Sequence, residues 1–304
     1  MKSIRYAEYG GPEVLELVDV PEPQAGPGQI RIAVHAAGVN GFDWKIRAGH
    51  LKEVAPVTFP SGTGLDAAGV VDQVGAGVED VETGTAVFGT GADTYAEYAV
   101  LSAWARKPGM LGFAEAAGYG VPVATAHRIL DQLHVTAGQT VLVSGASGGV
   151  GTALVQIAIS RGVRVIGTAS EANQSYLADL GATPVVYGHG LVDRARTLAA
   201  DGIDAAFDIA GSGIIPDLVE LTGDAAKVLS IADFTAPEHG AQVNTGAGGN
   251  RTAALAEAAR LFEAGQLRIP VANSFALDQA SEAHAASQTG HVAGRTVIVV
   301  RNGQ

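Results

Sequence analysis

The sequence predicts an α/β protein in which a β-rich domain, built from both ends of the chain, accompanies a doubly wound parallel sheet. Its 304 residues suffice for two domains, each with its own hydrophobic core. The middle of the chain alternates short apolar strands with helical periods, whereas both ends show strand texture interrupted by glycine and proline. A glycine-rich loop joins a strand to a helix near the centre. We therefore expect one domain at 1–115 and 266–304, and the other at 116–265.

The β-rich domain is predicted from short runs that alternate apolar and polar residues between turn signals. Such runs lie at 29–35, 69–74 and 86–88, and strand texture returns at 295–301. Period-2 alternation is typical of strands with one buried face, so an irregular antiparallel sheet is expected.

The parallel sheet is predicted from apolar runs at 141–143, 163–166, 184–186, 205–209 and 227–231. Between the first two, one helical face is marked by Val150, Ala153, Leu154, Ile157 and Ala158. The stretch 135–160 carries no charge and is long enough to span a bilayer. Its cluster of glycines and serines favours a strand, a turn and a helix instead.

The composition disfavours several classes of protein. With 47% hydrophobic and 16% charged residues, the chain is not disordered. A net charge of -12 disfavours nucleic-acid binding. The absence of cysteine excludes disulfides, thiol catalysis and cysteine-ligated metals. The first residues have no apolar signal core, so a cytoplasmic location without membrane attachment is expected.

The segment 145–151 has the pattern of a dinucleotide-binding loop, with Ala146 at the first glycine position. It follows a strand and opens a helix, which is the context that the motif requires. Small residues let the backbone approach a pyrophosphate, and the helix N-terminus offers free N–H groups and a partial positive charge. Gly151 is expected to let the helix pack closely on the strand. The alternative is a glycine-rich turn that binds no ligand.

The end of the second strand bears on which dinucleotide binds. An NAD site usually has a carboxylate there, whereas 167–169 reads Gly-Thr-Ala and leaves room for a 2′-phosphate. NADPH is therefore the expected cofactor. NADH stays open, because Glu171 lies at about the spacing of a ribose-binding acid and no basic residue follows before Arg194.

Several segments together resemble the zinc-independent, quinone oxidoreductase (zeta-crystallin-like) branch of the medium-chain dehydrogenase/reductase superfamily. They lie at 36–49, 64–71, 125–126, 145–151, 180–182, 204–208, 281–284 and 294–297. The resemblance implies a GroES-like catalytic domain around a Rossmann NADP-binding domain. It also implies an oxidoreductase that transfers hydride from NADPH to quinones or α,β-unsaturated carbonyls. Homodimers joined through the edge of the Rossmann sheet are common in the family, and 242–245 is a candidate edge strand.

The resemblance also bears on metal binding. Zinc-dependent relatives place a cysteine within the segment that reads Val-Asn-Gly-Phe-Asp here (39–43), and a histidine where this chain has Leu65. The eight histidines show no i,i+4 pair on a helix. No metal site is therefore expected, and without a Lewis acid direct alcohol oxidation is disfavoured.

The resemblance implies catalytic roles for Asn40, Asp43 and Lys45. Asn40 is expected to hydrogen-bond the substrate oxygen or the nicotinamide ribose, Asp43 to orient a neighbour, and Lys45 to stabilise an enolate or supply its proton. The alternatives are turn and helix-cap chemistry for Asn40 and Asp43, and a plain surface position for Lys45. Tyr95 and Tyr98 are alternative proton donors.

Cofactor contacts carry over residue by residue from the resemblance. Thr125 is expected near the nicotinamide, while Ser170 and Tyr187 are expected near the 2′-phosphate. The usual basic residue is missing at 173–175. The pyrophosphate and the nicotinamide-side ribose are expected to be held, respectively, by Ser147, Gly148, Gly149 and Val150, and by Ala210, Gly211, Ile231 and Ala232.

The acceptor stays open between quinones and enone or enoyl substrates. An enoyl reductase that tailors intermediates of a biosynthetic pathway is one alternative. A non-catalytic nucleotide-binding protein, as the crystallins of this family are, is another.

Overall fold

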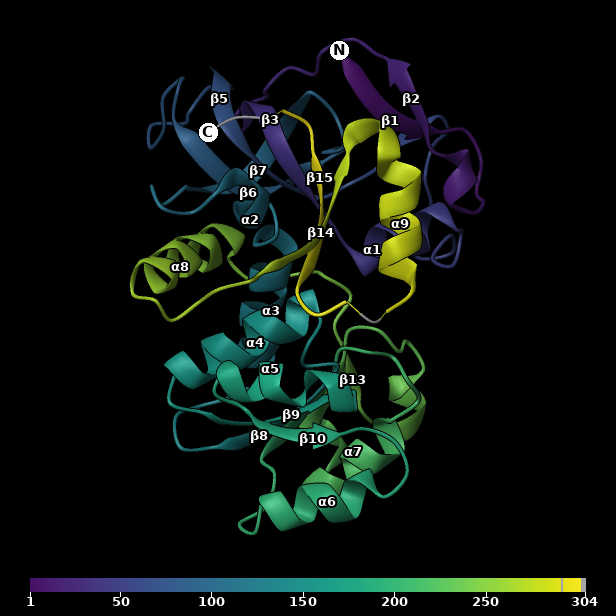
Figure 1. Ribbon diagram of the computed structural model, residues 1–304, viewed down its shortest axis with the longest axis vertical. Helices are drawn as coiled ribbons and strands as arrows, with labels where there is room; N and C mark the ends of the chain where they lie inside the picture. Colours follow the sequence, from purple (N-terminus) through teal and green to yellow (C-terminus); the bar gives the residue numbers. More distant parts are fainter. Residues whose placement is uncertain (291, 302–304) are drawn as a thin grey trace. The chain divides into compact units, whose positions relative to one another are not determined.

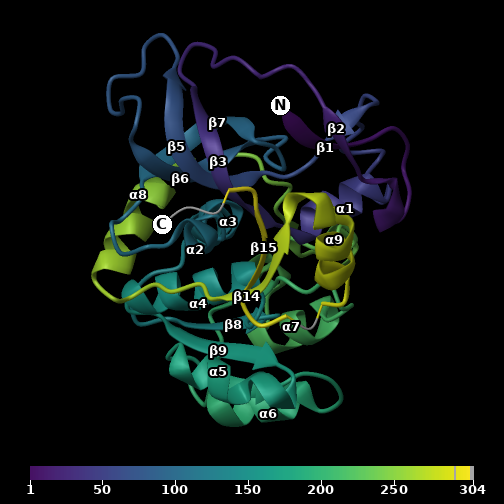
Figure 2. The ribbon, with the colours of Figure 1, turned by 45° about the horizontal axis from the view of Figure 1, so that its top comes forward.

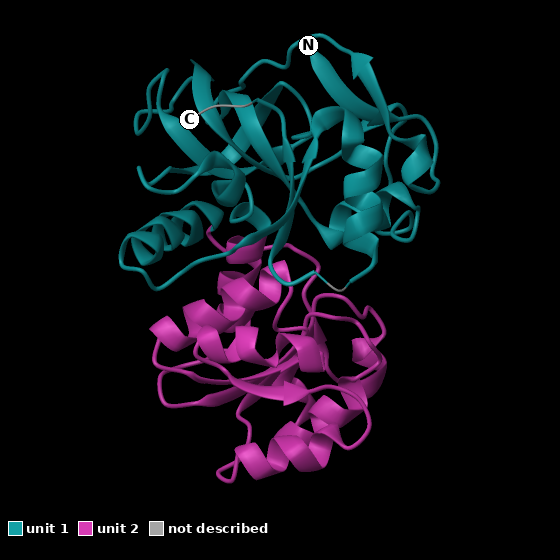
Figure 3. Cartoon of the chain, viewed as in Figure 1, with its two compact units in different colours: residues 1–121, 251–304 teal, residues 122–250 magenta. Residues whose placement is uncertain are grey.

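The computed structural model describes residues 1–290 and 292–301. The chain forms two compact units, Met1–Val121 with Arg251–Gln304 and Pro122–Asn250 (Figure 3). The sequence placed the divisions at 115/116 and 265/266, whereas the units divide at 121/122 and 250/251. The second junction differs because helix α8 (Arg251–Glu263) packs against strand β7 (Tyr98–Arg106) of the first unit.

The first unit contains two sheets. In the smaller sheet the order is β2-β1-β4, with β1 (Lys2–Tyr6), β2 (Glu16–Asp19) and β4 (Ser61–Gly62). In the larger sheet the order is β14-β15-β3-β5-β6-β7. Its further strands are β3 (Ile30–Val39), β5 (Asp66–Val74), β6 (Ala86–Ala92), β14 (Val271–Ala276) and β15 (Arg295–Val299).

The larger sheet closes on itself, because β3 pairs with β7 as well as with β5. Alternate residues of β3 point inward, and Ile30, Ile32 and Val34 are fully buried among side chains of the neighbouring strands. β15 pairs antiparallel with β3, so residues from both ends of the sequence share this sheet. The predicted antiparallel β-rich domain is therefore confirmed.

Short helices accompany these sheets. They are η1 (Pro12–Val14), α1 (Gly41–Arg47), α2 (Phe113–Ala116), η5 (Leu277–Gln279) and α9 (Ala280–Gln288). Figures 1 and 2 both show α9 beside α1, and the two helices are in contact. Helix α3 (Gly120–Gln132) contains the first junction between the units.

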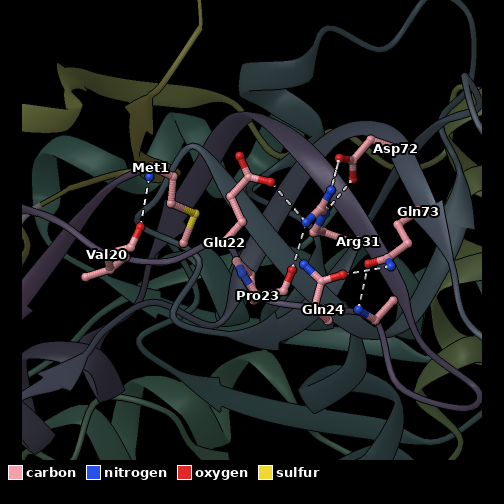
Figure 4. Close-up of polar contacts among 9 residues, drawn as sticks. Met1, Val20, Glu22, Pro23, Gln24, Arg31, Asp72 and Gln73 are labelled. Carbon is pink, nitrogen blue, oxygen red and sulfur yellow. Dashed lines mark hydrogen bonds and ion pairs between the residues drawn. The ribbon is translucent and has the colours of Figure 1, made fainter.

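The segment before β3 is tied to the sheet by polar contacts (Figure 4). Arg31 donates to both carboxylate oxygens of Asp72, and it also pairs with Glu22 at 3.2 Å. Its other guanidinium nitrogen donates to the Pro23 carbonyl. One guanidinium thus joins the chain at 22–23 to β3 and β5.

The second unit is a parallel sheet with the order β10-β9-β8-β11-β12-β13. Its strands are β8 (Thr140–Ser144), β9 (Arg164–Ala169), β10 (Thr183–Val186), β11 (Ala205–Asp208), β12 (Val228–Ser230) and β13 (Gln242–Val243). Successive strands are added outward from β8 toward β10 and then outward from β11 toward β13, so the strand order reverses between β8 and β11. This is the topological switch point where ligands bind in such sheets. The doubly wound Rossmann-like sheet is confirmed.

Helices cover this sheet on both faces. They are α4 (Gly149–Ser160), α5 (Gln174–Asp179), α6 (Leu191–Leu198) and α7 (Ile215–Thr222), with the 3-10 turns η2 (Glu171–Asn173), η3 (Ala225–Lys227) and η4 (Ala236–His239). Figure 1 shows α4 on one side of the strands and α6 and α7 on the other. The α6–α7 side buries Leu191 and Leu218 against Leu142.

The uncharged stretch 135–160 forms β8, a loop and the twelve-residue helix α4, as predicted. Across the described residues, we find no helix that combines the length and the apolar character needed to cross a bilayer.

Candidate functional site

The glycine loop lies at the carboxyl end of β8 and is tied to β9. Gly145 has a φ of +73°, and its N–H donates to Thr168 Oγ1 at 3.3 Å. The N–H of Ala146 donates to the Thr168 carbonyl at 3.0 Å. These bonds fix the turn against the second strand, so that α4 begins at Gly149 directly beyond it.

Two glycines of the loop serve different purposes. A Cβ on Gly151 would collide with the Gly145 carbonyl oxygen and the Ala146 backbone, so close packing of helix and strand requires glycine there, as expected. Gly148 has an ordinary φ of -74°, and the nearest atom to a Cβ on it would be 3.6 Å away. Packing within the protein therefore does not demand glycine at 148.

A glycine that packing does not require at 148 matches a ligand that approaches the backbone closely. No side chain of the described residues caps α4 at Gly148, so its first N–H groups remain available to an anion. The residues of this loop thus fit the pyrophosphate of a dinucleotide.

The loops that follow β8, β11 and β12 adjoin one another. A Cβ on Gly145 would lie 3.1 Å from the Ala210 Cβ, and one on Gly211 would lie 2.9 Å from the Ala232 Cβ. The structure therefore brings Ala210, Gly211 and Ala232 together beside the glycine loop. Ile231 follows β12 and donates its N–H to the Asp208 carbonyl.

The two loops after β11 and β12 are held by a buried carboxylate. Asp208 accepts from the Gly211 N–H at 2.9 Å and from the Ser230 hydroxyl at 2.8 Å. The Ser230 oxygen in turn accepts from the N–H groups of Ala232 and Asp233. Asp208 and Ser230 are both fully buried.

The residues expected near a 2′-phosphate follow β9 and β10 of the parallel sheet. Ser170 follows β9 and precedes η2. Tyr187 is about half exposed, and its N–H lies 3.4 Å from the Ala169 carbonyl. Arg194 donates to the carbonyls of Val186, Gly188 and His189, which flank Tyr187.

Thr125 lies on α3, where it is buried and accepts a hydrogen bond from Arg128. The Arg128 guanidinium also donates to Asn244, just beyond the edge strand β13. These contacts place Thr125 beside Arg128, and its expected position near the nicotinamide stays a prediction.

The first unit contains a buried polar network around Asn40 and Asp43, each 3% exposed. Asn40 precedes α1, and its N–H donates to Asp43 Oδ2 at 2.9 Å. The Tyr95 hydroxyl donates to the same oxygen at 2.9 Å. Burial raises the pKa of Asp43 to about 7, although these two donors and Arg295 pull it down.

Asp66 forms the other half of this network. Its Oδ2 accepts from Arg295 Nη2 at 2.9 Å and from the Asn40 amide at 3.1 Å, while its Oδ1 accepts from the Val121 N–H at 2.6 Å. Arg295 also donates to Asn40 Oδ1 at 3.1 Å. Burial raises the pKa of Asp66 to about 6 despite this cation.

Glycines make room for the Asp66–Arg295 pair. A Cβ on Gly38 would lie 2.7 Å from Arg295 Nη2, and one on Gly120 would lie 2.5 Å from Asp66 Oδ1. Part of the chain's glycine content therefore serves this charged pair rather than turns.

The arrangement favours the turn-and-cap interpretation of Asn40 and Asp43, because their polar atoms face protein partners. Lys45 is half-buried, with its ammonium 5.8 Å from the centre of the Trp44 ring. Tyr95 is fully buried and donates to Asp43. The Tyr98 ring contacts the guanidinium groups of both Arg31 and Arg301.

His284 lies on α9, fully buried, with its Nδ1 3.2 Å from Arg47 Nη1. Burial and the neighbouring Arg47 charge lower the pKa of His284 to about 3, so the ring is neutral at ordinary pH.

Sequence reasoning missed the roles of Asp66, Arg295, Asp208 and Ser230. Asp66, Arg295 and Asp208 stand in segments that carry the family resemblance, and each adjoins apolar strand residues. A charged side chain in such a run is a signal of a buried polar partner.

The residues present do not supply a zinc site. The sequence has no cysteine, and within 1–290 and 292–301 no three histidine, aspartate or glutamate side chains gather to hold a metal ion. His291 lies outside the described residues.

Comparison with known proteins identifies the family. Residues 26–129 match the model described as an alcohol dehydrogenase GroES-like domain, and residues 180–298 match one described as a zinc-binding dehydrogenase. A quinone oxidoreductase of Rattus norvegicus is 35% identical over 76% of this chain and 73% of its own. One of Pseudomonas aeruginosa is 30% identical over 98% of this chain and 99% of its own.

Solved structures that resemble this chain indicate the same family. The quinone oxidoreductase of Coxiella burnetii is 31% identical, covers 99% of both chains and superimposes with a TM-score of 0.83. A mycobacterial protein solved in complex with NADPH is 27% identical, covers 99% of this chain and 100% of its own, and has a TM-score of 0.85. The chain belongs to the medium-chain dehydrogenase/reductase superfamily of oxidoreductases, in its quinone oxidoreductase branch.

Proposed function

We propose that the chain is an NADPH-dependent, zinc-independent reductase of quinones or α,β-unsaturated carbonyls. The observation that carries this proposal is a glycine at 148 where the protein itself would accept a Cβ, beside helix N–H groups without a side-chain cap at the switch point of the sheet. Neither packing nor backbone conformation requires glycine at 148, so a ligand accounts for it best. Two relatives are quinone oxidoreductases, and a structural neighbour was solved in complex with NADPH, which supports the same substrate class and cofactor for this chain.

Within this proposal, the loop residues divide the cofactor between them. Ser147, Gly148, Gly149 and Val150 hold the pyrophosphate. Ala210, Gly211, Ile231 and Ala232 face the nicotinamide half, with Thr125 assigned to the same end.

Ser170 and Tyr187 face the 2′-phosphate. The loop of Tyr187 is held by Arg194, whose charge favours a phosphate there. Glu171 is exposed after β9, and its negative charge disfavours a phosphate there. NADPH is therefore the proposed cofactor, with NADH as the weaker alternative.

Bound NADPH supplies a hydride, and the acceptor must also gain a proton. We assign the proton supply to Lys45, because this residue is partly exposed, whereas the buried Tyr95 hydroxyl donates to Asp43. Asn40 and Asp43 act as positioning residues that fix the start of α1, on which Lys45 lies.

A side-by-side assay tests the proposal. Oxidation of NADPH and NADH is followed by the loss of nicotinamide absorbance with 1,4-benzoquinone, a cyclic enone and an enoyl thioester. Faster turnover with NADPH and at least one quinone or enone is expected. No turnover with any acceptor, despite NADPH binding measured by calorimetry, would overturn it and favour a non-catalytic nucleotide-binding protein.

The acceptor panel also separates the two substrate classes. Turnover of the enoyl thioester alone would indicate an enoyl reductase that tailors biosynthetic intermediates. Lys45→Ala is expected to slow enone reduction more than quinone reduction, because carbon protonation needs a placed donor. Equal effects on both would remove Lys45 from the proposal.

A homodimer joined along β13 is also proposed. β13 is the edge strand of the parallel sheet and leaves one side unpaired within the described chain. Light scattering coupled to size-exclusion chromatography measures the mass directly, and a monomer at micromolar concentration would contradict the proposal. The cytoplasmic location expected from the sequence stays a prediction.

A further inference from the structure

The carboxylate of Asp208 is buried in an unusual setting. It ends β11 with no exposed surface, and none of the described lysine, arginine or histidine side chains forms an ion pair with it. Burying a carboxylate is costly unless hydrogen-bond donors replace the lost water. Here the replacements are neutral donors, the Gly211 N–H on Oδ1 and the Ser230 hydroxyl on Oδ2.

The Ser230 hydroxyl uses all of its hydrogen-bonding capacity. It has one proton, directed at Asp208, and two lone pairs. The lone pairs accept from the Ala232 N–H at 3.1 Å and the Asp233 N–H at 2.8 Å. Because the hydroxyl donates to the carboxylate, its acceptor side is turned toward the two amides. Asp208 therefore sets the direction of every bond in the cluster.

The cluster joins two separate loops. Gly211 belongs to the loop after β11, whereas Ala232 and Asp233 belong to the loop after β12. Gly211 has a φ of +68°, and a Cβ on it would lie 2.9 Å from the Ala232 Cβ. The loops are thus packed together with little room for adjustment.

We infer that Asp208 and Ser230 are positioning residues that fix both loops for the nicotinamide half of the cofactor without touching it. This rests on the proposed function, which places Gly211 and Ala232 at that half. A preorganised pair of loops reduces the ordering cost of binding and holds the reacting ring in one orientation.

The direct test uses Ser230→Ala, which leaves the Ala232 and Asp233 N–H groups without their acceptor. Two ligands are titrated by calorimetry: NADPH, and 2′,5′-ADP, which has only the adenosine half. NADPH affinity is expected to fall about tenfold or more, and kcat to fall similarly, since two partly buried donors lose their acceptor. The affinity for 2′,5′-ADP is expected to stay within about twofold.

The matched control is Ser160→Ala, which removes a serine hydroxyl bonded to the Ile157 carbonyl at the far end of α4. It should leave both affinities and kcat unchanged. Asp208→Asn is the second variant. Its amide has only one acceptor oxygen, so it cannot accept from both Gly211 and Ser230 as the two carboxylate oxygens do. We again expect weaker binding of NADPH and unchanged binding of 2′,5′-ADP.

A measurement on the unaltered protein covers the case in which a variant does not fold. The amide hydrogens of Gly211, Ala232 and Asp233 are expected to exchange more than about 100-fold slower than in an unstructured peptide. Fast exchange at these sites would overturn the inference, as would equal losses for NADPH and 2′,5′-ADP in Ser230→Ala, or no loss for either. An unaltered protein that binds no NADPH would instead refute the proposed function.

Discussion

The buried polar networks of the two units have different roles. In the first unit, Asp66 faces the guanidinium of Arg295, and the network joins strands and a helix that are far apart in the sequence. In the second, Asp208 faces only neutral donors and joins two loops at the edge of one sheet. The first network completes a core, whereas the second holds two loops beside the glycine loop. Buried charge is therefore no guide to function until its partners are known.

The largest expected effect comes from removing the cation of the first network. Arg295→Met leaves the Asp66 carboxylate buried without its cation and should lower the free energy of unfolding by about 3–5 kcal/mol. Both tryptophans, Trp44 and Trp104, lie in the first unit, so urea unfolding followed by their fluorescence reports on that unit.

The matched control is Lys2→Met, which removes the exposed partner of Asp19 in the same unit. It is expected to cost less than about 1 kcal/mol. Equal costs for the two variants would show that the Asp66–Arg295 pair is not the stronger contact.

A smaller effect is expected from pH. The folded pKa of Asp43, about 7, lies above the ordinary value of 3.8. Between these values the unfolded chain has released the proton while the folded chain retains it, so the contribution of Asp43 to stability falls as pH rises from about 4 to about 7. The loss from Asp43 is on the order of 3 kcal/mol. Asp66, with a pKa of about 6, adds to it with the same sign.

Asp43→Asn isolates this contribution, since an amide accepts from Tyr95 and Asn40 at every pH. The difference in unfolding free energy between pH 5 and pH 8 is measured for both proteins by the same fluorescence. A shallower dependence is expected in the variant. Parallel curves would show that Asp43 does not titrate in this range.

The third effect concerns the glycine loop of the second unit. Gly148→Ala should change the melting temperature little, because its Cβ would make only an ordinary van der Waals contact, but should weaken NADPH binding by about tenfold. Gly151→Ala should lower the melting temperature markedly, because its Cβ would collide with the loop backbone. If Gly148→Ala binds NADPH as tightly as the unaltered protein, the loop does not hold the pyrophosphate.

The smallest effect is expected at Arg194. Its substitution by alanine frees the carbonyls of Val186, Gly188 and His189, and it removes a positive charge beside Tyr187. The ratio of NADPH to NADH affinity should fall by about threefold. An unchanged ratio in competition titrations would limit Arg194 to a structural role.

Local patterns sufficed for much of the fold. The alternation at 29–35 and the apolar runs of the parallel sheet predicted strands where the structure has them, since each pattern follows from burial of one or both strand faces. β5 begins at Asp66, three residues before the predicted strand, and β3 extends to Val39. Alanine and glycine give no alternation there, and Gly69 is needed where the Ala33 carbonyl approaches closely.

The candidate site was predictable only in part. The glycine loop is contiguous in the sequence, so the spacing of its residues is enough to predict dinucleotide binding. The partners of Asn40 and Asp43 lie at 66, 95 and 295, and no local spacing connects them. The sequence alone therefore could not predict their burial, and both turn chemistry and catalysis remained open for them.

The order of synthesis matters for a sheet in which β15 pairs with β3. Residues of the second unit are continuous in the sequence, so that unit can finish folding while the first still waits for β15. At ribosomal speeds the wait between Asn250 and Arg295 lasts on the order of seconds. During that time residues 36–39 of β3 lack their β15 partner and Asp66 lacks its cation. Nascent chains stalled before β15 should therefore depend most on chaperones.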